Sequence, residues 1–395
     1  MSAGGNAVLK PDFGAATAPI PPFTEEHEAF RVSARGWIER ELRPHADQWE
    51  ADKWIPESAF KAMAEQGYFG LKFDPAYGGD GDEVAAAVLA MEMARCGSGG
   101  VAAGLGAHME IALPPIAKFG DEEQKQRWLV PGIKGDIVAA LAITEPDAGS
   151  DVAGLKTTAT PVDGGWIVTG EKCYITGGCR ADVMVTAVRM AGTQRHDGIT
   201  FLAIERGEGV QSSALEKMGW HASDTALIKF DEVFVPEENL LGEVGGGFAL
   251  IMANFQWERL TMALGAVGAM EACFEQTVKY AQEREAFGRP ISKNQVIRHK
   301  FAEMATKIEV GRALSMHALR LHVAGQNAVQ EVSMAKLLTQ KAAVEVADEC
   351  LQIHGGAGYM VEYGIERAVR DARLGPIGGG TDEVMKEIVG KTLGL

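Results

Sequence analysis

The sequence lacks any excess of positive charge. Its 54 aspartates and glutamates outnumber the 38 lysines and arginines, which gives a formal net charge of −16. A protein that binds nucleic acid usually presents a basic surface, so we exclude nucleic acid as a partner. An anionic ligand would have to be held by local basic groups or by backbone N–H dipoles.

Long apolar runs and metal-binding spacings are missing as well. The longest uncharged run, Cys96–Met109, is rich in glycine and alanine and is too short to span a bilayer. The five cysteines lack metal-ligand spacing, which is typical of a reduced cytoplasmic protein with structural thiols. His317 and His322 do not form a convincing metal motif. We therefore expect no membrane span, no metal and a cytoplasmic location.

The order of helix-like and strand-like segments along the sequence predicts the domains. Residues 1–23 have no long apolar core and are expected to form a flexible lead. Helical periodicity follows in residues 24–135, short β-branched or aromatic runs in 136–244, and helical periodicity again in 245–395. The prediction is an α+β fold that is mostly α, with an N-terminal helical domain, a middle antiparallel β domain and a C-terminal helical domain.

The most informative stretch is residues 352–381, QIHGGAGYMVEYGIERAVRDARLGPIGGGT. Dense glycines let a backbone approach a ligand closely, although a loop between helices would explain the glycines equally well. The whole string resembles the C-terminal segment of the acyl-CoA dehydrogenase family, in which QxxGGxGY precedes an ExxxRDAR-type run and a Glu-Gly-Thr. In this chain Gly379 stands where most members carry the catalytic glutamate.

A second string, residues 143–151 (ITEPDAGSD), leads from the helical region into the β domain. Alone it would indicate a Pro/Gly turn, but it resembles the family's TEPxAGSD motif. The resemblance implies that Leu141, Ile143 and Thr144 face the flavin ring of FAD. It also implies that Ser150 lies beside the FAD phosphates and the coenzyme A.

A third string resembles the family's aromatic-Ile-Ser/Thr strand. The resemblance implies that Tyr174 shields one edge of the flavin and that Thr176 bonds near its N5 atom. Alone, a tyrosine on a strand more often indicates sheet packing.

The element from Arg284 to Pro290, with Gln295 beyond it, resembles the family's R-x-x-F-G…Q pattern. A plain helix end, with Gly288 as its C-cap, is the alternative explanation. The resemblance implies that Arg284 pairs with the FAD pyrophosphate and that Phe287 and Gln295 hold the adenosine. Arginine suits such bidentate phosphate binding.

The resemblance also implies an oligomer. In the family, the residues just named reach the cofactor of a neighbouring subunit, as do Gln352, Gly355 and Gly356, whereas Thr381 and Glu383 touch FAD from the same chain. A cofactor held by two subunits predicts an obligate assembly, and the family resemblance indicates a homotetramer.

The catalytic base is expected at Glu258. α,β-Dehydrogenation needs a carboxylate to accept the proton and donors to stabilise the enolate-like charge. Gly379 supplies no carboxylate, although its N–H can polarise the thioester. Glu258-Arg259-Leu260 resembles the isovaleryl- and long-chain branch, which carries its base here. An ordinary helix ion pair is the alternative. The implied substrate contacts are Ser150, Gln256, Arg259 and Gly380.

One further stretch, Lys217–Thr225, resembles the family's KxGxRxSxT pattern, with His221 where arginine is frequent. We assign His221 no role at this point, because a lone histidine is more often a packed or surface side chain than a catalyst.

Taken together, these patterns predict an FAD-dependent acyl-CoA dehydrogenase that makes trans-2-enoyl-CoA and passes electrons to electron-transfer flavoprotein. An acyl-CoA oxidase or a flavin monooxygenase on the same fold is an alternative, although Glu258 argues against the monooxygenase. A non-catalytic flavin- or CoA-binding scaffold, suggested by Gly379, is the alternative from a different class.

Overall fold

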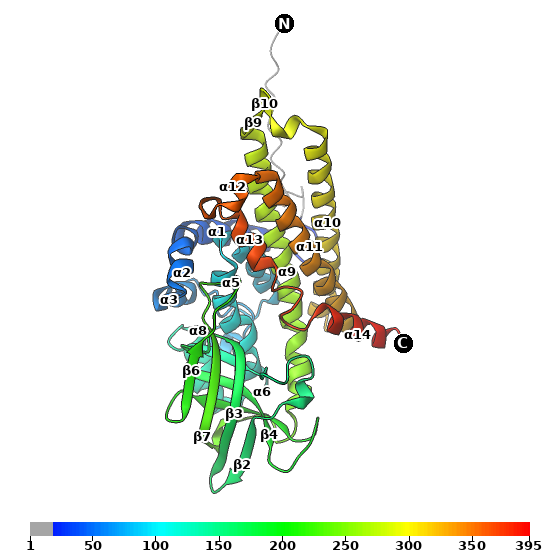
Figure 1. Cartoon of the computed structure of the whole chain (residues 1–395). Helices are drawn as coiled ribbons and strands as arrows, with labels where there is room; N and C mark the ends of the chain where they lie inside the picture. The colour runs from blue at the N-terminus through cyan, green and yellow to red at the C-terminus, as the bar shows by residue number, and fades with distance from the viewer. Residues whose placement is uncertain (1–18) are drawn as a thin grey trace.

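The computed structural model describes residues 19–395. Helices, a β-sheet and then long helices follow one another along the chain (Figure 1), so the predicted fold class is confirmed. The sheet lies at one end of an elongated molecule, and the long C-terminal helices extend to the other (Figure 1). The flexible lead expected for residues 1–23 lies mostly outside the described residues. Between residues 19 and 395, no helix is long and apolar enough to cross a membrane.

Short helices with clear sequence caps form the N-terminal part. Thr24 caps the first helix by accepting from the His27 N–H, and Asp82 caps the fourth by accepting from the N–H groups of Val84 and Ala85. Such side-chain acceptors satisfy donors that the first helical turn leaves unpaired. The helices are α1 (Glu25–Glu41), α2 (Ala46–Asp52), α3 (Glu57–Glu65), α4 (Glu83–Glu92), α5 (Gly99–Gly106), α6 (Leu113–Phe119), α7 (Glu122–Gln124) and α8 (Val130–Ile133).

An eight-stranded sheet forms the middle part, in the order β6-β7-β3-β2-β4-β5-β8, with β1 paired to β4. Most pairings are antiparallel as expected, but β1 and β2 both pair in parallel with β4. The strands are β1 (Ala139–Ala142), β2 (Thr158–Val162), β3 (Gly165–Thr176), β4 (Val183–Met190), β5 (Ile199–Glu205), β6 (Val210–Ala214), β7 (Thr225–Pro236) and β8 (Leu240–Leu241). The sequence did not indicate β1 as a strand, because β1 contains no β-branched residue.

The C-terminal part is built on three long helices that pack along one another (Figure 1). Helix α9 also crosses α4 closely at Gly268, where a Cβ atom would lie only 2.0 Å from the Met91 carbonyl oxygen. The core therefore runs continuously from the N-terminal helices into the C-terminal ones. The helices are α9 (Gly247–Glu283), α10 (Gln295–Val323), α11 (Val329–His354), α12 (Gly356–Tyr359), α13 (Ile365–Ala372) and α14 (Asp382–Thr392).

A small hairpin joins α9 to α10 at the end of the molecule opposite the sheet (Figure 1). It consists of β9 (Glu285–Ala286) and β10 (Arg289–Pro290). Phe287 and Gly288 form its two-residue turn, both with positive φ (54° and 77°), as tight hairpins require. The expected helix C-cap at Gly288 is therefore wrong, because α9 already ends at Glu283.

Candidate active site

Glu258 on α9 and Gly379, in the turn between α13 and α14, lie next to each other. A Cβ atom at Gly379 would be 3.5 Å from Glu258 Oε1. The two positions that the family resemblance offers for a catalytic carboxylate therefore face the same space in this chain, although they lie on different elements.

The carboxyl group of Glu258 is buried and poorly satisfied. Its Oε2 has no hydrogen-bond partner among residues 19–395. Burial raises the pKa of Glu258 to about 7, although the charges of Arg259 and Lys336 act to lower it. Among residues 19–395 Glu258 forms no ion pair within 4.0 Å, and the Nε of Arg259 donates to a backbone carbonyl oxygen. A carboxyl that titrates near neutral pH suits general-base catalysis.

Two cations hold the glycine turn beside Glu258. Arg259 Nε donates to the Gly379 carbonyl oxygen at 3.0 Å, and Lys336 Nζ donates to the Gly380 carbonyl oxygen at 2.5 Å. Both glycines have positive φ (62° and 98°). Within the described part of the chain, no hydrogen bond uses the N–H groups of these two glycines. The turn therefore presents free amide donors next to a carboxyl group, an arrangement that can bind a carbonyl oxygen on which charge develops.

Lys336 was not predicted from the sequence. It lies on α11, fully buried among Val332, Ala335, Thr339 and Ala343. The sequence did contain a signal, because Lys336 lies at helical spacing within a stripe of small and apolar residues. A lysine in such a stripe is expected to be buried, and a buried lysine seldom lacks a partner. Burial lowers the pKa of Lys336 to about 8.

The residues expected around the flavin ring fall in two adjacent segments, Leu141–Thr144 and Tyr174–Thr176. The Cys173 N–H donates to the Thr144 carbonyl oxygen at 2.9 Å, which joins the segments. The side chain of Tyr174 is strongly exposed (71%), and its backbone has φ 60°, an unusual value for a bulky residue. An exposed aromatic ring beside two threonines fits a flat aromatic group such as a flavin.

A buried lysine braces this region. Lys172 Nζ donates to the Ile143 carbonyl oxygen at 2.9 Å and to Glu145 Oε1 at 2.7 Å. Glu145 also accepts from two backbone N–H groups further along the chain. This brace was also missed in the sequence. Its signal was that Lys172 shares the inward register of Trp166 and Val168 along β3.

Four further residues predicted to contact FAD or the substrate are exposed or half-buried. Thr381 caps α14 by accepting from the Val384 N–H at 3.3 Å, and Glu383 lies exposed in the first turn. Ser150 is exposed in the turn after β1, and Gln256 is half-buried on α9, just before Glu258. Their roles as contacts stay predictions.

A second set of predicted cofactor residues lies at the opposite end of the molecule. Arg284 and Phe287 belong to the β9–β10 hairpin, and Gln295 opens α10 (Figure 1). The Phe287 side chain is fully exposed (100%). The chain does not bring this set to Tyr174, so one copy alone does not assemble all of the predicted FAD contacts.

The end of α11 lies beside the same hairpin end. Tyr280 Oη, near the end of α9, donates to the His354 carbonyl oxygen at 3.2 Å. Gln352, Gly355 and Gly356 are therefore grouped with the hairpin, away from Tyr174. Side chains at either glycine would meet open space, so this surface is free to contact another molecule.

The sequence and the structure were compared with those of known proteins. Family models of the acyl-CoA dehydrogenase N-terminal, middle and C-terminal domains match residues 24–136, 140–233 and 245–394. The chain is similar to an acyl-CoA dehydrogenase of Bacillus subtilis, 38% identical over 94% of this chain and 98% of that protein. It is also similar to the mitochondrial long-chain specific acyl-CoA dehydrogenase of Sus scrofa, 38% identical over 94% and 87%. A crystal structure of an acyl-CoA dehydrogenase from Geobacillus kaustophilus superposes with a TM-score of 0.92, at 41% identity, covering 95% of this chain and 100% of that one.

Proposed function

The chain belongs to the acyl-CoA dehydrogenase family of flavoprotein oxidoreductases, and from this premise we propose that it is an FAD-dependent enzyme. It converts an acyl-CoA thioester to the trans-2-enoyl-CoA. The electrons pass to electron-transfer flavoprotein in the cytoplasm. The proposed domains are residues 24–135, 136–244 and 245–395.

The observation that carries the proposal is the placement of Glu258 against the glycine turn. Glu258 is proposed to remove the proton from the carbon next to the thioester carbonyl. The N–H of Gly379 is proposed to donate to that carbonyl oxygen as negative charge develops. Arg259 and Lys336 fix the turn through its carbonyl groups. Gln256, Ser150 and Gly380 are proposed to contact the rest of the substrate.

The proposed flavin site uses Leu141, Ile143 and Thr144 with Tyr174 and Thr176. When bound, FAD supplies the acceptor for the hydride that leaves the β-carbon. The exposed Tyr174 ring would cover one edge of the flavin, and the brace at Lys172 keeps the first segment in place.

A homotetramer is proposed from the family resemblance, and the remaining predicted contacts, which lie at the hairpin end of the molecule, support an assembly in which two copies share a cofactor. The set comprises Arg284, Phe287, Gln295, Gln352, Gly355 and Gly356. In the assembly they would hold the FAD of a neighbouring copy, while Thr381 and Glu383 would contact the FAD of their own chain.

Arg284→Ala tests this shared site. FAD occupancy and oligomer stability should fall together, with roughly 10- to 100-fold weaker FAD retention for the loss of a charge-assisted phosphate contact. Sedimentation combined with flavin absorbance checks this after extensive dialysis. Intact oligomers that keep all of their flavin would contradict the intersubunit role.

Anaerobic addition of acyl-CoA tests the reaction. The flavin absorbance should bleach, which a non-catalytic scaffold would not show. Oxygen is then admitted: rapid reoxidation would identify an oxidase, and slow reoxidation supports the dehydrogenase. A panel of straight and branched acyl-CoA substrates with a dye acceptor would then define the acyl specificity.

A further inference from the structure

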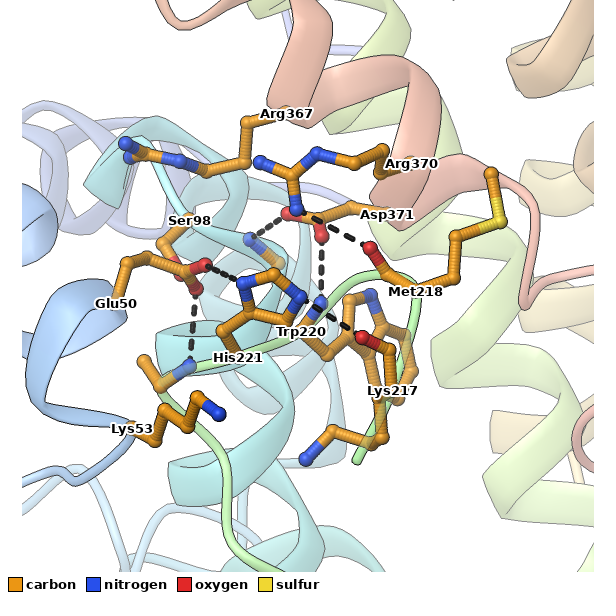
Figure 2. A network of polar contacts seen from close by, with 12 residues as sticks. Glu50, Lys53, Ser98, Lys217, Met218, Trp220, His221, Arg367, Arg370 and Asp371 are labelled. Atoms are coloured by element: carbon orange, nitrogen blue, oxygen red, sulfur yellow. Dashed lines mark hydrogen bonds and ion pairs between the residues drawn. The ribbon is translucent and has the colours of Figure 1, made fainter. Parts of the chain in front are cut away.

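Two buried carboxylates meet at the start of α5, away from the proposed base. Glu50 comes from α2 in the N-terminal part, and Asp371 comes from α13 in the C-terminal part. The segment Lys217–Asp224, here called the joint loop, belongs to the middle part and leads into β7. Figure 2 shows both carboxylates reaching toward this loop from two sides. All three parts of the fold meet at this point.

Asp371, from the C-terminal part, accepts hydrogen bonds from the main chain of both the middle part and the N-terminal part. Its Oδ1 accepts from the Trp220 N–H at 2.6 Å, and its Oδ2 accepts from the Gly99 N–H at 2.9 Å (Figure 2). Trp220 belongs to the joint loop and Gly99 is the first residue of α5. One side chain of the C-terminal part thus fixes a loop of the middle part against a helix of the N-terminal part.

Glu50 makes a second connection between the same two segments. Its Oε1 accepts from the hydroxyl of Ser98 at 2.5 Å and from the Ala222 N–H at 3.1 Å. Ser98 is the N-cap of α5. Both carboxylates therefore lie at the N-terminal end of one helix, where the helix dipole favours negative charge.

Three glycines make this close approach possible. A Cβ atom would lie 2.9 Å from Asp371 Oδ2 if placed at Gly99, and 2.7 Å from Asp371 Oδ1 if placed at Gly219. A Cβ atom at Gly100 would lie 2.7 Å from Glu50 Oε1. Any larger residue at these positions would push the carboxylates away from the amide groups they bind.

The arginines of α13 do not neutralise Asp371 directly. Arg367 pairs with Asp47 at 2.7 Å, and Arg370 pairs with Glu366. Burial raises the pKa of Asp371 to about 6, even though the two N–H groups act to lower it. Burial thus acts against the ionised carboxylate, whereas the two N–H groups favour it.

His221, which the sequence left without a role, belongs to the joint loop. Its Nε2 lies 2.9 Å from the Lys217 carbonyl oxygen, to which it donates, and its Nδ1 lies 3.9 Å from Glu50 Oε2. The ring therefore closes the loop on itself beside the Glu50 carboxylate (Figure 2).

The joint loop is hydrogen-bonded to the segment that follows β3. The Gly177 N–H donates to the Asp224 carbonyl oxygen at 3.0 Å, and the Cys179 N–H donates to Asp224 Oδ2 at 2.9 Å. Thr225, the next residue, is the sheet partner of Thr176. A displacement of the joint loop would therefore move the segment that carries Tyr174 and Thr176.

We propose that Asp371 and Glu50 are positioning residues for the cofactor site. By fixing the joint loop to both helical parts, they hold the end of β3 where Tyr174 and Thr176 face the flavin. The packing of the three domains and the affinity for FAD are then coupled, although neither carboxylate touches the cofactor. This inference rests on the proposed binding of FAD.

The test compares FAD binding with the stability of the apoprotein. Asp371→Asn and Glu50→Gln keep the shapes of the side chains. Titration of apoprotein, followed by flavin fluorescence, should show a Kd raised about 5- to 150-fold for Asp371→Asn, and raised less for Glu50→Gln. Asp371→Asn replaces one of the two accepting oxygens with an NH2 group, so it loses one of the two hydrogen bonds as it removes the buried charge. The thermal unfolding midpoint of each apoprotein is measured beside the Kd, so that a loss of stability is told apart from a loss of FAD affinity. The visible circular dichroism of flavin bound at saturation should also change.

Glu275→Gln is the matched control. Glu275 accepts two hydrogen bonds from Arg95, at 2.8 and 3.0 Å, and so joins α9 to the N-terminal part without touching the joint loop. Its FAD Kd should equal that of the wild type. An unchanged Kd in Asp371→Asn, or an equal rise in Glu275→Gln, would overturn the inference. Wild-type apoprotein that fails to bind FAD would instead overturn the proposed function.

A measurement on the wild type keeps the inference testable if both variants fail to fold. Hydrogen exchange of the Trp220 and Ala222 amides, which donate to the two carboxylates, should slow when FAD is added to the apoprotein. If FAD leaves both exchange rates unchanged while it binds, the joint loop is not coupled to the cofactor.

Discussion

Glu258 and Asp371 are both buried carboxyl groups of the C-terminal part, and burial raises their pKa values to about 7 and about 6. Their hydrogen bonds differ. Asp371 binds two backbone N–H groups, whereas Oε2 of Glu258 has no partner among residues 19–395. Hydrogen bonds to the charged form of a carboxyl favour ionisation and fix its position, whereas an unsatisfied buried carboxylate favours taking up a proton. The difference favours proton transfer for Glu258 and positioning for Asp371.

A third buried carboxyl shows that a raised pKa alone does not identify a base. Glu271 lies on the same helix as Glu258, and burial also raises its pKa to about 7. Its Oε1, however, accepts from Arg312 Nη2 at 2.7 Å. Two observations separate Glu258 from Glu271: its Oε2 has no hydrogen-bond partner among residues 19–395, and its Oε1 lies beside the glycine turn.

The largest expected effect comes from Glu258→Gln. This variant should keep FAD and bind acyl-CoA, but should lose roughly 10²- to 10⁴-fold in the rate of flavin reduction, because an amide accepts no proton. Anaerobic stopped-flow absorbance measures this rate. Glu271→Gln is the control from the same helix and should reduce its flavin at the wild-type rate. If the two variants behave alike, the comparison between these carboxyls fails.

A smaller effect is expected from returning a carboxylate to position 379. A Cβ atom there would point toward Glu258 Oε1 but would lie 2.5 Å from Met262 Sδ, and the backbone has φ 62°. Methionine is flexible and can move, while the φ value costs about 1–3 kcal/mol. Gly379→Glu in the Glu258→Gln background should therefore regain activity only partly, roughly tenfold, with shorter or unbranched acyl chains preferred.

Gly379→Gln in the same background is the control for this rescue, because it adds the bulk without the carboxylate. Adding Met262→Ala to the double variant that carries Gly379→Glu and Glu258→Gln should increase the gain. A double variant that folds and binds both FAD and acyl-CoA, yet gains nothing over Glu258→Gln, would show that position 379 does not face the α-carbon.

The stability of Glu258→Gln should depend on pH in a defined direction. Because the folded pKa of Glu258 is raised from 4.5 to about 7, its contribution to stability is complete below pH 4.5 and is lost as the pH rises through 7. The variant carries no such dependence. It should match the wild type near pH 4 and be more stable by about 1–3 kcal/mol near pH 8. Chemical unfolding of the apoproteins measures this, and a difference independent of pH would contradict it.

The layers of the fold could be predicted from the sequence because helical and strand periodicity are local patterns, and the proposal of Glu258 as the base also rests on local patterns. Periodicity separated helices from strands, and the paired observation of Gly379 and Glu258 indicated which carboxyl was available. The hairpin at Gly288 was missed because a glycine after a helix is usually a cap, and only the φ values reveal the two-residue turn.

The contacts of Asp371 and Glu50 could not be predicted from the sequence for a different reason. Asp371 binds Gly99 across 272 positions of the chain, and Glu50 binds Ala222 across 172. Such contacts depend on how domains pack, which no local pattern encodes. Lys336 and Lys172 are intermediate cases. Their place within buried stripes was visible, but the carbonyl groups they bind were not.

The pH dependence of flavin reduction in the wild type and in Glu258→Gln tests the central claim most directly. With acyl-CoA in excess under anaerobic conditions, the wild-type rate should rise with pH through about 7 and then level off, because Glu258 must lose its proton before it can accept one. The residual rate of Glu258→Gln should be low and should lack this rise. A Glu258→Gln variant that reduces its flavin at nearly the wild-type rate, with the same pH profile, would show that another group is the base.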